Sequence, residues 1–330
     1  MDTIVEIRNL TKTYRRKIDK KTGLRSIFQK NDYEQVYALK GINISISRGE
    51  FVGFLGINGA GKSTTIKLLA GIMPPDEGSA TINGLNTYSN IKKISPKIGI
   101  LFGQRSSLVW DLPFIHSLEL LKDVYSVSDT QYEESIELAD RFFGIKSLLK
   151  VPVRTMSLGQ RMKCEFTAIL LHQPELYILD EPTIGLDIVT KKQINRFLSY
   201  LNLEYQATIF LTTHDIGVVE KSCKRIIVIN NGEVLLDNAT TEVVDHYPAT
   251  FASLTAKDED ADIDFGQYRE MIEVLNRDRN QWMIKINEKG DPAREILTFV
   301  MSSNELSGIS IDKPDLESVL LYLYENQDMK

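Results

Sequence analysis

A glycine-rich loop between an apolar strand and a helix constrains this chain more than any other feature. The segment EFVGFLG, residues 50–56, is dense in apolar residues and predicts a buried strand. After the loop, STTIKLLAGI has the spacing of a helix, which Pro74 and Pro75 end. The loop itself, GINGAGKST at 56–64, fits the pattern G-x-x-x-x-G-K-[ST]. Strand, glycine turn and helix start in this order predict a phosphate-binding loop.

The residue types in this loop suit phosphate chemistry. Glycines let the backbone turn its N–H groups toward phosphate oxygens, and the helix start adds its dipole. We expect Lys62 to reach the β- and γ-phosphates of a nucleotide and Ser63 to ligate Mg²⁺. The loop residues expected to contact the nucleotide are Gly56, Asn58, Gly59, Ala60, Gly61, Lys62, Ser63 and Thr64.

A second apolar strand ends in two carboxylates, in the segment LYILDEPT at 176–183. Burying charge is costly, so adjacent acids at the end of a buried strand predict a cation nearby. We expect Asp180 to hold Mg²⁺ and Glu181 to take a proton from an attacking water.

The remaining pattern predicts an α/β fold. The central strands are nearly all apolar, which is typical of a parallel sheet covered on both faces. Further strands are predicted at 42–47, 97–103, 207–213 and 225–230, and helices at 114–126 and 130–143. Near the other end, the acidic run KDEDADID resembles a linker, and the strand and helix patterns after it predict a small α+β domain. We therefore expect a first domain at 1–240, a linker at 241–265 and an accessory domain at 266–330.

Several motifs along residues 3–240 resemble those of the ATP-binding subunits of ABC transporters. After the phosphate loop come Gln104 in LFGQR, MSLGQ in the place of the family's LSGGQ signature, the Asp-Glu pair, GLD and TTHD. The resemblance implies a P-loop NTPase cassette with a RecA-like core, N-terminal antiparallel strands and a helical subdomain at about 105–172. It also implies ATP and Mg²⁺ as cofactors.

The resemblance assigns roles to further residues. Tyr14 would stack on adenine, Gln104 would ligate Mg²⁺ and act in catalysis, and His214 would contact the γ-phosphate. In the family, two cassettes close head to tail around two ATP molecules, and the signature of one covers the ATP held by the other. The residues implied at that second face are Ser157, Gly159, Gln160 and Asp187.

The signature differs from LSGGQ at two positions. Met156 for Leu conserves volume. Leu158 for Gly adds a side chain, which matters only if that backbone position needs a positive φ. Because Ser157 and Gly159 remain, we expect a functional motif. The alternative is a weakened half-site that only binds ATP.

A basic segment at 15–32, within an insertion placed at 15–36, separates Tyr14 from VYALKGI. Residues 15–32 carry seven Lys or Arg and two Asp, and GLRSIFQ within them can form a short amphipathic turn. Two interpretations stay open: contact with an anionic membrane surface or membrane subunit, or a solvated loop. Similar insertions in cassettes of drug, peptide or polysaccharide exporters favour the first. The segment PDLESVL, 314–320, resembles a motif that ends the C-terminal domain of such cassettes.

Charge, cysteine content and the length of apolar runs limit the classes of function and the compartment. The net charge of −6 argues against bulk nucleic-acid binding, and two cysteines favour a reducing compartment. The N-terminus does not read as a signal peptide, and no apolar run approaches the ~20 residues that span a bilayer.

The resemblance implies an ATPase that energises a separately encoded membrane permease of the exporter type, from the cytoplasmic face of the membrane as a peripheral subunit. Its other partner would be a second cassette, either a second copy or a paralogue. The alternatives are a soluble ABC ATPase acting on nucleic acid or ribosomes, and a non-hydrolysing regulatory cassette, against which Glu181 argues.

Overall fold

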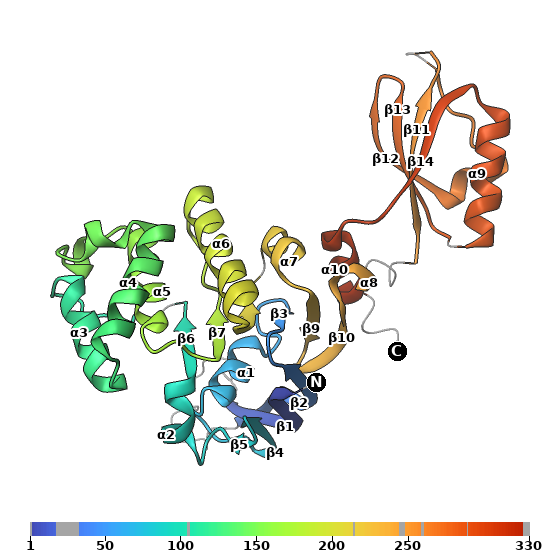
Figure 1. Cartoon of the computed structure of the whole chain (residues 1–330). Coiled ribbons are helices and arrows are strands. Elements are labelled where there is room, and N and C mark those ends of the chain that lie inside the picture. The colour runs from blue at the N-terminus through green and yellow to red at the C-terminus, as the bar shows by residue number, and fades with distance from the viewer. Residues whose placement is uncertain are drawn as a thin grey trace, which may run out of the picture. The chain divides into compact units, whose positions relative to one another are not determined.

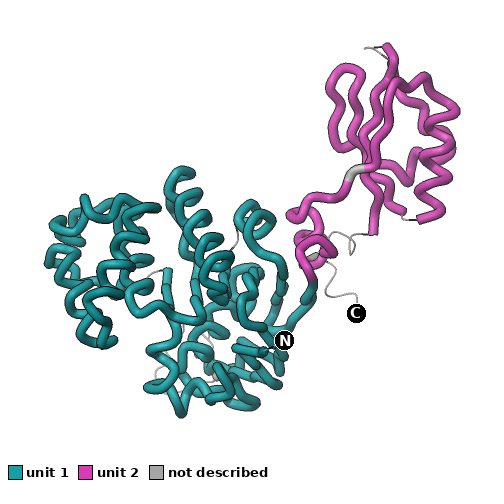
Figure 2. The backbone as a smooth tube through the Cα atoms, in the orientation of Figure 1, with its two compact units in different colours: residues 1–238 teal, residues 239–330 magenta. Residues whose placement is uncertain are grey.

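The computed structural model describes residues 2–17, 33–103, 106–213, 215–243, 248–258, 261–288 and 290–325. The chain divides into two compact units, residues 1–238 and 239–330 (Figure 2). Each unit has its own sheets and its own buried apolar residues.

A six-stranded sheet forms the centre of the first unit, in the order β10-β9-β3-β8-β7-β6. Its strands are β3 Phe51–Leu55, β6 Ile98–Phe102, β7 Leu176–Asp180, β8 Thr208–Thr212, β9 Arg225–Asn230 and β10 Glu233–Ala239. The five strands from β9 to β6 pair in parallel. Every residue of β3 and β8 is buried, as expected for strands covered on both faces. The carboxyl ends of these strands meet at one edge.

A four-stranded antiparallel sheet packs against this centre, in the order β2-β1-β4-β5. Its strands are β1 Thr3–Lys17, β2 Tyr33–Ser47, β4 Glu77–Ile82 and β5 Leu85–Asn86. One apolar core includes Ile7 and Ile44 from this sheet and Val52 and Ile178 from the parallel sheet. The pairing of β1 with β2 continues to Lys17 opposite Tyr33, so the two ends of the basic insertion form a ribbon. Residues 18–32, with the expected amphipathic turn, lie outside the described residues.

Helices surround the sheet of the first unit. They are α1 Lys62–Leu69, α2 Ile91–Ile94, α3 Phe114–Tyr125, α4 Asp129–Phe143, α5 Leu158–Leu170, α6 Ile188–Tyr205 and α7 Ile216–Ser222. Helices α3, α4 and α5 gather beside the sheet (Figure 1), where α5 packs against α3 and α4, and α4 also packs against α6. Helix α4 begins at Ser128, whose hydroxyl accepts from the Gln131 N–H, and ends at Gly144 with a left-handed φ of 64°. These three helices lie within the range expected for the helical subdomain.

The second unit holds a separate antiparallel sheet in the order β12-β13-β11-β14. Its elements are α8 Thr240–Val243, β11 Thr250–Ala256, β12 Ile272–Asp278, β13 Gln281–Ile286, α9 Asp291–Ser303, β14 Leu306–Asp312 and α10 Leu316–Glu325. Helix α9 buries Ile296 and Val300 in one cluster with Leu254 and Ile284 of the sheet.

The expected linker at 241–265 is wrong. Strand β11 lies inside that range and pairs with β13 on one side and β14 on the other. Ile263 and Phe265, at the end of the acidic run, are buried in the same core as α9. The segment TFASLTA carries Phe251 and Leu254 among small and polar residues, a pattern weaker than the acidic run that follows it.

Candidate nucleotide-binding site

The loop between β3 and α1 requires glycine at three positions. Gly59 and Gly61 have φ of 85° and 114°, in the left-handed region that other residues rarely adopt. A Cβ at Gly61 would lie 2.6 Å from the Ala38 carbonyl oxygen, and one at Gly56 would lie 2.5 Å from the Ile229 carbonyl oxygen. The loop therefore has no room for side chains at its tightest points, which leaves its backbone N–H groups accessible to a ligand.

Lys62 opens α1 and is buried, with 8% of its surface exposed. Its Nζ donates to the carbonyl oxygens of Gly56 at 2.5 Å and Ile57 at 3.3 Å. The same Nζ lies 4.0 Å from Glu181 Oε1. Burial lowers the pKa of Lys62, while the carboxylates of Glu181 and Asp180 oppose that shift. A cation is thus held within the loop, where phosphate would compensate it.

Asp180 ends β7 among oxygen atoms. Its Oδ1 lies 3.5 Å from Ser63 Oγ and accepts a hydrogen bond of 2.8 Å from Thr212 Oγ1. A carboxylate and a hydroxyl are the hard oxygen donors that Mg²⁺ prefers. Two side chains predicted as metal ligands therefore come together, Ser63 from the first turn of α1 and Asp180 from the end of β7. Gln104, the third predicted ligand, lies outside the described residues.

Glu181 follows with a backbone φ of 50°, an uncommon conformation for a residue with a side chain. Such strain costs on the order of 1–3 kcal/mol and concentrates at functional sites. The Glu181 N–H donates to the carbonyl oxygen and to the hydroxyl of Thr212, each at 3.1 Å. Thr212 therefore contacts the Asp180 carboxylate and the Glu181 backbone, a role that sequence reasoning missed. Its position, opposite Asp180 at the end of the neighbouring strand β8, was the available signal.

The altered signature begins α5 with a capping box. Ser157 Oγ accepts from the Gln160 N–H at 3.2 Å, and the Ser157 N–H donates to Gln160 Oε1 at 2.9 Å. Leu158 is the first helical residue and is absent from the residues with positive φ. Its side chain is half exposed and lies against Gly185, 3.2 Å from where a Cβ would stand. The backbone here accepts leucine, so the condition under which Leu158 would distort the motif is not met.

The signature also contacts the GLD segment. A Cβ at Gly159 would lie 3.1 Å from Thr190 Oγ1 and 3.6 Å from Asp187 Oδ2. Asp187 caps α6, and the pKa of its carboxyl is lowered because the N–H and hydroxyl of Thr190 donate to it. Ser157 and Asp187 are exposed. Large apolar side chains are exposed in the same motifs: Leu158, Ile184, Ile188 and Val189.

Two aromatic residues stand near the loop end of the antiparallel sheet. Tyr14, the predicted adenine contact, lies on β1 and its hydroxyl donates to Met73 Sδ at 3.3 Å. Tyr37 was not predicted; it is exposed and precedes Ala38, which touches Gly61. Sequence reasoning could have weighed it as the last aromatic residue before ALKGI. His214, the predicted γ-phosphate contact, is outside the part of the chain that the structure describes.

Comparison with known proteins identifies the family to which this site belongs. A family model described as ABC transporter matches residues 39–184. The ABC transporter ATP-binding protein NatA of Bacillus subtilis is 31% identical over 204 residues, which are 62% of this chain and 82% of NatA. The chain belongs to the ATP-binding proteins of ABC transporters. A further relative, the linearmycin resistance ATP-binding protein LnrL of the same organism, is 33% identical over 65% of this chain and 68% of LnrL.

Solved structures agree with this membership. A dimeric post-hydrolysis state of the ATP-binding cassette MJ0796, bound to ADP and phosphate, is 29% identical and covers 72% of this chain and 98% of that chain, with a TM-score of 0.60. The expected fold, a P-loop NTPase cassette with a small α+β domain after it, is therefore confirmed. As an ABC ATP-binding protein, this chain is the nucleotide-binding subunit of a transporter and belongs to a family of ATPases. None of its described helices is both long and apolar enough to cross a membrane.

Proposed function

We propose that this ABC protein hydrolyses Mg²⁺-bound ATP between two cassettes and thereby energises a separate membrane permease of the exporter type. The observation that carries the proposal is the meeting of Lys62, Ser63, Asp180 and Glu181 at the carboxyl edge of the parallel sheet. They lie beside a loop in which only glycine fits.

Each of these residues has a distinct task in the proposed reaction. Lys62 balances the charge of the β- and γ-phosphates, and the loop N–H groups orient them. Ser63 and Asp180, with Gln104 as a predicted third ligand, would hold Mg²⁺, which supplies positive charge to the phosphates when bound. Glu181 takes the proton from the attacking water, and Thr212 anchors the Glu181 backbone N–H at this position. His214 would contact the γ-phosphate.

The signature face supports pairing with a second cassette. Ser157 is exposed at a helix N-terminus, where its hydroxyl and the local N–H groups suit a phosphate. Leu158 and Ile188, exposed in the adjacent motifs, provide apolar surface for a partner. The related cassette MJ0796 was solved as a dimer. A second copy of this chain is the simplest partner, and a paralogue is the alternative.

An apolar hollow supports docking on a permease at the cytoplasmic face of the membrane. A cavity of about 270 Å³ lies between β6 and helices α3 and α5, lined among others by Ile100, Phe102 and Leu121. Trp110, Leu112, Leu120 and Val124 are exposed in and just before α3. A related ATP-binding subunit, cbiO1, is part of the transporter complex cbiONQ. The exporter direction rests on the family resemblance and on the relative named for linearmycin resistance.

Reconstitution tests the proposal. The chain is co-purified with the membrane proteins encoded beside its gene, and phosphate release is measured in anionic lipid with and without them. We expect hydrolysis that the permease stimulates, and loss of ATP binding in Lys62→Ala. Lys67→Ala, on the same helix but outside the loop, is the matched control.

Three outcomes would overturn parts of the proposal. ATP binding without phosphate release would support the regulatory cassette instead. Stimulation by RNA or ribosomes, with no effect of the permease, would support the soluble ATPase. Normal hydrolysis by Lys62→Ala would remove the assigned site.

A further inference from the structure

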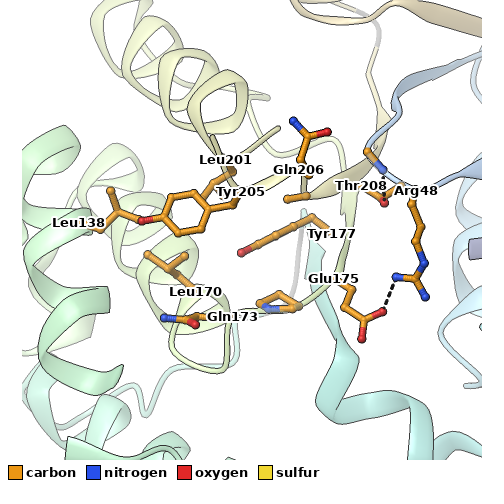
Figure 3. Close-up of a pocket in the computed structure, with 13 residues that line it drawn as sticks. Arg48, Leu138, Leu170, Gln173, Glu175, Tyr177, Leu201, Tyr205, Gln206 and Thr208 are labelled. Carbon is orange, nitrogen blue, oxygen red and sulfur yellow. Dashed lines mark hydrogen bonds and ion pairs between the residues drawn. The ribbon is translucent and has the colours of Figure 1, made fainter. Parts of the chain in front are cut away.

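A second cavity lies at the opposite edge of the parallel sheet from the nucleotide site. Its volume is about 440 Å³, within the range of small-molecule pockets. It is formed where β7 and β8 begin, and it is lined there by Tyr177 and Thr208. Figure 3 shows its two sides, one with leucine side chains and Tyr205, the other with Arg48 and Glu175.

The apolar side belongs to three helices. Leu138 comes from α4, Leu170 from α5 and Leu201 from α6, and each of these side chains is more than nine-tenths buried. Tyr205 at the end of α6 completes this side and is exposed at the rim. An apolar ligand body of modest size could pack against this side.

One polar group points into the cavity without a hydrogen bond. Tyr177 is 2% exposed, and its hydroxyl is directed toward the side that holds Leu170 and Tyr205 (Figure 3). This hydroxyl has no hydrogen-bond partner among the described residues. Burial raises the pKa of Tyr177, so the phenol stays neutral and can donate. The hydroxyl opens into the cavity, where a ligand acceptor could take its hydrogen bond.

The charged groups at the cavity are already paired with one another. Arg48 Nη1 lies 2.7 Å from Glu175 Oε2, and Arg48 Nε lies 2.8 Å from Asp2 Oδ2. Glu175 also accepts from Asn83 at 3.2 Å and lies 3.6 Å from Lys97 Nζ. A charged ligand would have to displace one of these partners, whereas an uncharged ligand would not.

The cavity touches the far ends of three elements that carry the nucleotide-site motifs. Helix α5 runs from the signature at Ser157 to the cavity wall, and α6 runs from Asp187 to it. Strand β7 carries the Asp-Glu pair at its other end. These elements span roughly 15–30 Å by their lengths. A ligand that wedges their far ends apart or draws them together would change how the motifs face ATP.

We propose that this cavity is a regulatory site for an uncharged amphipathic small molecule, which accepts a hydrogen bond from Tyr177 and changes the rate of ATP hydrolysis. The regulatory half rests on the proposed function, whereas the binding half does not. Two probes of one shape test the chemistry: 4-fluoroacetophenone, which is uncharged and carries an acceptor, and 4-fluorobenzoate, which is an anion.

Binding of both probes to the full chain is measured by ¹⁹F NMR titration without nucleotide. We expect the ketone to bind at least about tenfold more tightly than the carboxylate. Tyr177→Phe should weaken ketone binding by about 3- to 10-fold, the usual worth of one hydrogen bond. Leu138→Trp, which fills the cavity, should weaken it by at least about tenfold. Tyr132→Phe removes a hydroxyl from α4 outside the cavity and should leave it unchanged.

Phosphate release is then measured with saturating ketone. We expect at least a twofold change in kcat for the wild type and none for Leu138→Trp, whose thermal midpoint confirms folding. Absence of binding, or equal binding to wild type, Tyr177→Phe and Leu138→Trp, overturns the site. Binding without a change in rate overturns the regulatory role. If the chain releases no phosphate at all, the proposed function fails, and the binding series still decides the site.

Discussion

Two glutamates flank strand β7 and differ in their charged neighbours and in their backbone conformation. Glu175 precedes β7 and is surrounded by Arg48, Lys97 and Asn83. Glu181 follows β7, lies 4.0 Å from the Lys62 ammonium and has a left-handed backbone. The first acid lies among cations and an amide that belong to the protein. The second lies near an ammonium that also donates to the carbonyl oxygens of the phosphate loop.

The difference indicates that one edge of the parallel sheet contributes mainly to folding stability and the opposite edge mainly to catalysis. At the edge where β7 begins, charges are matched within the protein, so a substitution there should cost folding free energy. At the edge where β7 ends, the charges converge around a place for phosphate, so a substitution there should cost rate. Substitutions at one edge or the other, read by reaction rate or by unfolding free energy, test that division.

The largest expected effect is on catalysis at Glu181. Glu181→Gln keeps the shape but removes the base, so we expect hydrolysis to slow by about 10²–10⁴-fold while ATP binding remains. A closed, ATP-bound dimer should accumulate, measurable by size-exclusion chromatography with ATP. Wild-type turnover in this variant would show that Glu181 is not the general base.

Thr212 and Thr208 stand at the two ends of β8 and allow a matched test. Thr212→Val removes the hydroxyl that contacts Asp180 and Glu181, and we expect at least a tenfold fall in kcat. Thr208→Val removes the acceptor of the Gly49 N–H. Thr208→Val should cost about 0.5–1.5 kcal/mol of unfolding free energy in urea, because the Gly49 N–H loses its acceptor. Thr212→Val should cost less, because the Glu181 N–H keeps the Thr212 carbonyl oxygen and Asp180 keeps Ser63. The division between the edges is wrong if Thr208→Val lowers kcat as much as Thr212→Val.

Sequence patterns predicted the catalytic edge because its signals are local. The apolar run of β3, the glycine loop and the first turn of α1 are contiguous, and the Asp-Glu pair directly follows the apolar run of β7. Contacts between distant segments carried no such signal. The approach of Ala38 to Gly61 and the tether from Thr212 to Glu181 join residues that are more than 20 positions apart.

The same limit explains the errors elsewhere. The sequence pattern of β11 is weak, because its partners β13 and β14 come later in the chain and its apolar residues are small or isolated. The cavity at Tyr177 could not be predicted from the sequence for a similar reason, since its walls come from α4, α5, α6 and two strands. A buried strand predicts that a tyrosine is packed, and it says nothing about where the hydroxyl finds room.

The altered signature tests a smaller effect at the catalytic face. Leu158→Gly restores the family residue, and helix α5 already begins there with ordinary backbone angles. We expect kcat to change by less than about threefold, with a loss of up to ~1 kcal/mol in unfolding free energy because glycine is a poor helix former. Phosphate release and urea unfolding check the two values. A large gain in rate would mean that leucine weakens the natural motif.

The smallest expected effect lies at the Glu175 edge and concerns pH. Burial alone would raise the pKa of Glu175, but hydrogen bonds from Arg48 and Asn83 and the charge of Lys97 outweigh it, and the net pKa is lowered. A carboxylate whose pKa is lowered in the folded state stabilises the fold above its unfolded pKa of about 4.5, and that stability is lost as the pH falls further.

Glu175→Gln should therefore cost only about 0.2–1 kcal/mol of unfolding free energy at pH 7, as exposed ion pairs do. The difference between wild type and variant should shrink below pH 4.5. Urea unfolding at pH 7, 5, 4 and 3 measures it, and Arg48→Met combined with Glu175→Gln isolates the pair. Equal acid sensitivity of wild type and Glu175→Gln would mean that the ion pair does not stabilise the folded state, and that the edge at the start of β7 owes its stability to packing alone.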